Sequence, residues 1–183
     1  MEQAAVLTEP SRVGRDGPVL VVIGGLPGSG KTTLLRRLLA EEAPALTALD
    51  SEFVAERFRR AGIGVPYRFL RPWVHVVHRQ RVLRAVRGGD PVVVLTDPWT
   101  AERWRSVVLR AAAMAGRRVR LVHLDAGPEL AAEGQSARGR RLSERAMRRH
   151  VQRSAGAAAA QDAFVVDRRR ADALRLAEIL GAP

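Results

Sequence analysis

The chain has 183 residues, of which 46% are hydrophobic, and it contains no cysteine. This composition fits one well-buried domain and excludes disulfides, thiolate metal sites and a cysteine nucleophile. No apolar run approaches the roughly 20 residues that cross a bilayer, so we expect a soluble, cytoplasmic protein with no membrane partner. The net charge of +12 is typical of proteins that bind nucleic acid. Aromatic residues for base stacking make up only 4% of the chain, however, so nucleic acid is the less favoured partner. Nothing in the sequence indicates the oligomeric state.

The first apolar run carries the most specific motif. Residues 1–17 show little periodicity and are expected to be a flexible leader before a single domain of residues 18–183. The run from Val19 to Ile23 predicts a buried parallel strand. It leads into Gly25-x-x-x-x-Gly30-Lys31-Thr32, the full pattern of a phosphate-binding P-loop, which chance produces in fewer than about one in a thousand such sequences.

This glycine-rich turn predicts a site for the polyphosphate of ATP. Glycines let successive backbone N–H groups converge on one concavity, and the helix that follows adds its positive dipole end. Lys31 is expected to reach the β- and γ-phosphates, and the Thr32 hydroxyl to ligate Mg²⁺. Lys31 is the only lysine among 31 basic residues, which favours a specific need for a compact ammonium group. The predicted nucleotide-binding residues are Gly25, Leu26, Pro27, Gly28, Ser29, Gly30, Lys31, Thr32 and Thr33.

The next segments predict a ligand-binding sheet edge with a helical wall. A helix over residues 33–42 stops before Pro44, and residues 45–49 predict a short strand followed by Asp50. In a doubly wound sheet, ligands bind at this edge. Two further helices, over residues 53–61 and from Leu70 to the glycines at 88 and 89, supply more chain than a plain crossover needs, so they are expected to form one wall of an acceptor pocket.

A second acid follows the next strand. Residues 91–96 predict a core strand that ends in Asp97, and residues 100–115 predict the helix after it. A carboxylate at this place beside a P-loop can hold Mg²⁺ through water. The alternative is an N-cap or an Asx turn before Thr100. On the preceding helix, His75 and His78 lie three residues apart without a third metal ligand, so a pocket wall or packing is the preferred interpretation.

The last third of the chain predicts a lid and the end of the sheet. Residues 117–124 predict a strand ending in Asp125, and residues 127–156 predict two helices joined by an arginine-rich turn. Residues 163–166 predict the last strand and residues 167–180 one closing helix. Five apolar strands alternating with helices require a parallel sheet with right-handed crossovers. The predicted fold is therefore an α/β P-loop NTPase three-layer sandwich, with a five-stranded parallel sheet, helices on both faces and a helical lid.

The order of the motifs allows a family resemblance to be stated. The set G-L-P-G-S-G-K-T, L-D-S-E, V-V-V-L-T-D, L-V-H-L-D-A and A-R-G-R-R resembles the small P-loop kinases of the AAA-type group. These include adenylyl-sulfate kinases, gluconate kinases, polynucleotide 5′-hydroxyl kinases, zeta-type toxins and chloramphenicol phosphotransferases. The resemblance implies transfer of the γ-phosphoryl group of ATP, with Mg²⁺, to a hydroxyl of an antibiotic, nucleoside or sugar-like molecule.

The same resemblance implies roles for individual residues. Asp50 matches the carboxylate that accepts the proton of the attacking hydroxyl. Arg138 and Arg141 match lid arginines that neutralise charge on the transferred group, with a solvated arginine turn as the alternative. Glu52 stands where many relatives have Asp, and the candidate arginine Arg57 lies farther along, which weakens the polynucleotide kinase alternative. A non-kinase P-loop ATPase or switch is the second alternative, disfavoured because no N-K-x-D sequence is present.

Overall fold

The computed structural model describes residues 17–42, 46–61, 67–127, 129–131, 134, 147–153 and 163–181. Its strands form one parallel sheet in the order β2-β3-β1-β4-β5, which confirms the predicted fold class. The strands are β1 (Val19–Gly25), β2 (Leu46–Leu49), β3 (Val92–Thr96), β4 (Arg118–Asp125) and β5 (Phe164–Asp167). Residues 1–16 of the predicted leader and the arginines Arg138 and Arg141 lie outside the described residues.

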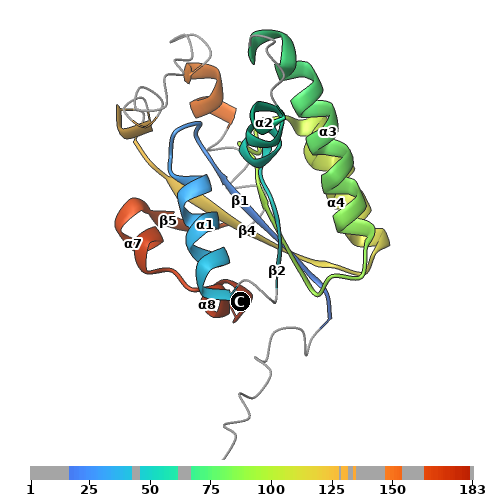
Figure 1. Ribbon diagram of the computed structural model, residues 1–183. Coiled ribbons are helices and arrows are strands. Elements are labelled where there is room, and N and C mark those ends of the chain that lie inside the picture. Colours follow the sequence, from blue (N-terminus) through green and yellow to red (C-terminus); the bar gives the residue numbers. More distant parts are fainter. Residues whose placement is uncertain are drawn as a thin grey trace, which may run out of the picture.

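Helices cover both faces of this sheet (Figure 1). They are α1 (Lys31–Glu42), α2 (Ser51–Arg60), α3 (Tyr67–Arg87), α4 (Glu102–Met114), α7 (Arg168–Ala173) and α8 (Leu176–Gly181). Helical backbone also occurs at residues 129–131, at residue 134 and at residues 147–153. No helix in the described part of the chain is long and apolar enough to cross a membrane.

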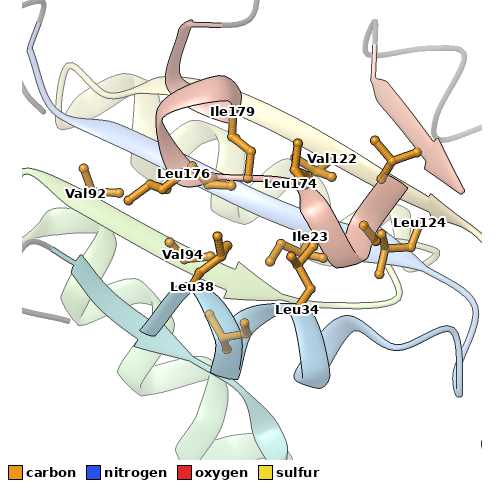
Figure 2. Close-up of a cluster of buried hydrophobic side chains, with 14 of the residues drawn as sticks. Ile23, Leu34, Leu38, Val92, Val94, Val122, Leu124, Leu174, Leu176 and Ile179 are labelled. Atoms are coloured by element: carbon orange, nitrogen blue, oxygen red, sulfur yellow. The ribbon is translucent and has the colours of Figure 1, made fainter. Parts of the chain in front are cut away.

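The strands are buried on both sides, so the molecule has two main hydrophobic layers. Along β1, Val21 and Ile23 face one layer while Leu20 and Val22 face the other, as alternation along a strand requires. The first layer packs β1, β3 and β4 against α1, α7 and α8 (Figure 2). The second layer packs the opposite face against α3 and α4. This double coverage explains why the strands read as continuous apolar runs.

Most helices begin two or three residues away from the predicted position, since α1 starts at Lys31, α3 at Tyr67 and α4 at Glu102. Two further differences have a visible cause. Helix α2 begins at Ser51 rather than at residue 53, because the Asp50 side chain accepts a hydrogen bond from the Glu52 backbone N–H and caps the first turn. The predicted single closing helix is wrong, since Leu174 adopts an extended conformation between α7 and α8. The break lets both Leu174 and Leu176 enter the core, and Arg37 donates to the Leu174 carbonyl at the end of α7.

A buried arginine joins the far end of α3 to the sheet. The Arg117 guanidinium donates to the carbonyl oxygens of Val86 and Asp90, both at 2.7 Å, and of Gly88 at 2.8 Å. It makes longer bonds to the carbonyls of Ala85 and Val19, at 3.3 and 3.4 Å. The last carbonyls of a helix have no partner within the helix, so Arg117 satisfies the end of α3 and ties it to β1.

We expect Arg117→Met to lower the free energy of unfolding by about 3 kcal/mol, because the variant keeps the aliphatic stem but leaves buried carbonyls without donors. Urea unfolding measures this difference. Arg110→Met is the matched control, since Arg110 is exposed on α4 and its replacement should change stability by less than about 0.5 kcal/mol. An equal, small effect in both variants would show that the guanidinium contributes little.

Candidate active site

The P-loop connects β1 to α1 at the carboxyl edge of the sheet. Gly25, Gly28 and Gly30 all have positive φ angles, of 130°, 92° and 100°, which disfavour residues with a Cβ. At Gly25 a Cβ atom would lie 2.6 Å from the Leu124 carbonyl oxygen of β4, so the loop also needs glycine for close approach. The turn closes with the Ser29 N–H donating to the Leu26 carbonyl. The sequence motif therefore forms a compact turn at the start of α1.

The only lysine lies over this turn. The Lys31 ammonium donates to the carbonyl oxygens of Gly25 at 3.0 Å and Leu26 at 2.7 Å. Burial is the largest cause of the pKa shifts at three titratable groups nearby: it raises the pKa of Asp97 and lowers those of His123 and His150, and the Lys31 charge acts on each of the three in the lowering direction. Lys31 is thus at the electrostatic centre of the strand ends, where a polyphosphate would need positive charge.

A buried hydrogen bond joins Thr32 to Asp50. The Thr32 hydroxyl donates to Asp50 Oδ2 at 2.7 Å, and both side chains are buried. The other carboxylate oxygen, Oδ1, accepts the Glu52 N–H at 2.7 Å and caps α2. Asp50 is only 4% exposed, so these two hydrogen bonds fix its carboxylate within the protein. The structure brings the predicted metal-binding hydroxyl and the predicted base into direct contact.

Asp97 has two hydrogen-bond partners in the loop and helix that follow β3. Its Oδ1 accepts the Trp99 N–H at 2.6 Å, which is the Asx turn left open by the sequence, and its Oδ2 accepts the Trp104 indole N–H at 3.2 Å. Burial raises the pKa of Asp97, although the Trp99 N–H, Lys31, Trp104 and Arg79 all act to lower it. The carboxylate is therefore held in position but retains lone pairs for a bound water.

The loop around Asp97 is locally strained. Trp99 has a φ of 60°, the only positive value at a non-glycine residue in the described part of the chain, and its side chain is buried. The Arg105 guanidinium donates to the Trp99 carbonyl at 2.9 Å and holds this conformation. Bulky residues in this region of φ are rare and occur where the surroundings fix them. The Trp99 Cβ lies beside Gly24, just before the P-loop, 3.5 Å from where a Cβ atom on that glycine would stand.

Two described pieces of the predicted lid contact the site. In the helical segment 147–153, His150 Nδ1 forms a hydrogen bond of 3.1 Å with the Thr100 hydroxyl. At Gly134, an added Cβ would clash with the carbonyl oxygen of Gly28 in the P-loop, so the lid backbone lies directly on the phosphate-binding turn. These contacts place described residues of segment 127–156 against the P-loop and against the loop that follows β3.

His78 lies on the inner face of α3 and is 4% exposed. Its Nδ1 atom has no hydrogen-bond partner among the described residues. The pKa of His78 is lowered to about 4, mainly by burial. The nearby Asp50 carboxylate acts to raise this pKa, whereas His75, Arg81 and Arg79 act to lower it. The imidazole is therefore neutral near pH 7 and lies close enough to Asp50 to feel its charge.

The structure brings most of the sequence-predicted site residues together. The nine P-loop residues from Gly25 to Thr33, together with Asp50 and Asp97, lie at the carboxyl edge of the sheet. Arg138 and Arg141 fall outside the described residues. The sequence did not predict the contact of Gly134 with Gly28 or the pair formed by Thr100 and His150. In both contacts the two partners lie far apart in the chain, so no local pattern indicates them. Asp50 as an N-cap could have been found from the helical pattern that follows it.

Comparisons with known proteins agree with this geometry. The model of a family described as an AAA domain matches residues 20–161. A gluconokinase from Sinorhizobium meliloti 1021 superposes with a TM-score of 0.52 at 18% identity, covering 89% of this chain and 87% of that one. The Deinococcus radiodurans tunicamycin resistance protein gives a TM-score of 0.55 at 15% identity, covering 91% and 97%.

A third structure comes from the Pnkp1/Rnl/Hen1 RNA repair complex. It gives a TM-score of 0.60 at 17% identity and covers 78% of this chain but 46% of that one. No curated protein sequence matches the chain. At these identities the structural likenesses show a shared P-loop kinase-like fold.

Proposed function

The chain belongs to the AAA domain family through residues 20–161, and from this membership we propose that it is an ATP-dependent kinase that phosphorylates a hydroxyl of a small molecule. The acceptor we propose is antibiotic-, nucleoside- or sugar-like. Two of the similar structures carry names that refer to small compounds, a gluconokinase and a tunicamycin resistance protein. The P-loop supplies the phosphate site, and the carboxyl edge of the sheet supplies the acids.

The observation that carries the proposal is the 2.7 Å bond between the Thr32 hydroxyl and the Asp50 carboxylate. It places a carboxylate beside the residue that follows the P-loop lysine. A kinase needs a proton acceptor near the attacking hydroxyl, whereas a pure nucleotide-binding module does not. We assign this role to Asp50, which takes the proton of the acceptor hydroxyl as its oxygen attacks the γ-phosphorus and ADP leaves.

The donor set fits Mg²⁺. Thr32 uses its single hydroxyl proton in the bond to Asp50, which leaves its oxygen lone pairs for a cation. Asp97 can act on the same cation through water, because its direct hydrogen bonds leave acceptor capacity on both oxygens. When bound, Mg²⁺ neutralises the charge of the β- and γ-phosphates. Lys31 adds its charge from the P-loop side, and we keep Arg138 and Arg141 as the proposed lid arginines.

Polynucleotide 5′-hydroxyl kinase is the second candidate, and a surface feature favours it. Phe69 and Trp73 are 58% and 65% exposed, and they lie four residues apart on α3, so their rings share one face. Helix α3 contains no acidic residue. Aromatic rings on a basic helix can stack bases, and one similar structure comes from an RNA repair complex.

An ATP-consumption screen over small hydroxylated compounds and a 5′-hydroxyl oligonucleotide tests both candidates. We expect turnover with a small molecule and a KM that changes far less with salt than the affinity for an oligonucleotide would. The affinity for an oligonucleotide acceptor would instead fall steeply as the salt concentration rises, with a log–log slope of about 0.7 per neutralised phosphate. Submicromolar oligonucleotide binding with that slope, coupled to end phosphorylation, would replace the small-molecule assignment.

A further inference from the structure

One face of α3 carries a row of basic side chains. Arg71, His75 and Arg79 follow one another at intervals of four residues, so they lie along the same side of the helix over about 12 Å. All three are exposed. Because α3 has no acidic residue, the helix itself offers these groups no counter-charge. We call these three residues the α3 basic row.

The row has no anionic partner in the described part of the chain. No hydrogen bond or ion pair joins Arg71 or His75 to another described residue, and the contact of Arg79 is the Trp104 ring, 4.9 Å from its guanidinium carbon. The three groups also act on one another, since Arg71 and Arg79 lower the pKa of His75 after burial does. Two arginines on one helix face without a counter-ion repel each other, and a bound anion would offset that repulsion.

One end of the row reaches the proposed catalytic residues. The Trp104 indole beneath Arg79 donates to Asp97, and Arg79 contributes to the pKa values of both Asp97 and His78. His78 adjoins Arg79 in sequence, feels the charge of Asp50 and has a buried Nδ1 without a partner among the described residues. The row therefore starts beside the acids and extends away from them along α3.

The position of α3 separates the row from the triphosphate site. Helix α3 packs against α2 and contacts β2 and β3, and its first turns lie beside α2 at the end of the sheet where β1 leads into α1 (Figure 1). The triphosphate belongs at the end of β1, within the P-loop. A molecule with its hydroxyl at Asp50 and an anionic group farther out would extend along α3.

We propose that Arg71, His75 and Arg79 bind an oxyanion, a phosphate or a carboxylate, on the acceptor, so that the substrate is a small hydroxylated anion. The inference rests on the proposed kinase function and narrows its substrate class. Arg71 and Arg79 pair with the anionic group through charge-assisted hydrogen bonds. His75, between them, adds a further donor. These three side chains determine specificity, while Asp50 remains the proton acceptor.

The first experiment compares matched acceptor pairs that differ by one anionic group: gluconate with glucose, glycerol 3-phosphate with glycerol, and AMP with adenosine. We expect turnover with at least one anionic member and a KM for its neutral partner at least 10-fold higher. Which anionic members react distinguishes carboxylate from phosphate. Better turnover of the neutral members would overturn the inference, and so would phosphorylation of a 5′-hydroxyl oligonucleotide with none of the small anions.

The second experiment uses variants of the row. Arg71→Met should raise the KM for the anionic acceptor about 10-fold or more with little change in kcat, since it removes a charge-assisted bond. Arg84→Met is the matched control, because Arg84 is also exposed on α3 but lies outside the row, and its KM should stay within about 2-fold. Equal effects of the two variants would show general attraction by positive charge and overturn the assignment.

Calorimetric binding of the same anions, with the P-loop saturated by a non-hydrolysable ATP analogue, separates the two proposals. Binding that Arg71→Met weakens, without any phosphoryl transfer, would refute the kinase function and leave the anion site standing. Transfer to acceptors whose KM does not respond to Arg71→Met would refute the anion site and leave the kinase function standing.

Discussion

Lys31→Ala is expected to lower phosphoryl transfer by on the order of 10³-fold or more, while the midpoint of thermal unfolding stays unchanged. The ammonium lies at the P-loop carbonyls of Gly25 and Leu26, where no backbone N–H can replace its positive charge at the β- and γ-phosphates. The side chain is only partly buried, so its removal leaves no cavity in the core. ADP formation with the best acceptor from the screen, together with circular dichroism melting, measures both quantities.

Arg36→Ala is the control for this variant. Arg36 is exposed five residues farther along α1 and pairs with Glu56 on the surface, so losing its charge should change turnover by less than about 2-fold. Full turnover in Lys31→Ala would contradict the kinase assignment. A comparable loss in both variants would show that general positive charge, rather than the P-loop ammonium, matters.

Asp50→Asn is expected to lower turnover by about 10²-fold or more with little change in ATP affinity. The amide preserves the local structure, because its oxygen can accept the Glu52 N–H while its NH₂ group donates to the Thr32 hydroxyl, which can reverse its direction. What disappears is the proton acceptor. Single-turnover kinetics at saturating ATP isolate the chemical step, and equilibrium binding of a nucleotide analogue reports the affinity.

Glu52→Gln distinguishes the two neighbouring acids. It removes a carboxylate two residues away on the first turn of α2 and should retain most of the turnover. A large loss in Glu52→Gln with none in Asp50→Asn would reassign the base. Recovery of Asp50→Asn activity at high Mg²⁺ concentration would show instead that Asp50 acts by orienting Thr32 toward the metal.

The parts of this molecule that could be predicted are those set by local chemistry. Continuous apolar runs identified the strands, because residues buried on both faces of a parallel sheet cannot alternate with polar ones. The P-loop could be located to the residue because its glycines and its lysine serve a fixed backbone geometry. Asp50 and Asp97 could be placed at one edge because parallel strands end together.

The parts that could not be predicted depend on contacts between distant segments. The Thr32–Asp50 bond and the stacking of Arg79 on Trp104 depend on which strands are neighbours, and one chain's periodicity does not determine strand order. The break between α7 and α8 follows from the burial of Leu174 against the sheet, which overrides the helical pattern around it. The positive φ of Trp99 is likewise imposed by its surroundings.

The strand order also governs what happens while the chain is being made. Both strands that pair with β1 are synthesised long after it, since Val19 pairs with Val92 of β3 and with Arg118 of β4. Strand β2 also has to wait for β3, which is its partner. No two strands of this sheet can therefore pair before residue 92 has been synthesised. At about 5 to 20 residues per second, the apolar segment of β1 waits roughly 3 to 13 s without a partner. During that interval aggregation competes with folding, so the yield of native protein depends on whatever shields five consecutive aliphatic side chains on the ribosome.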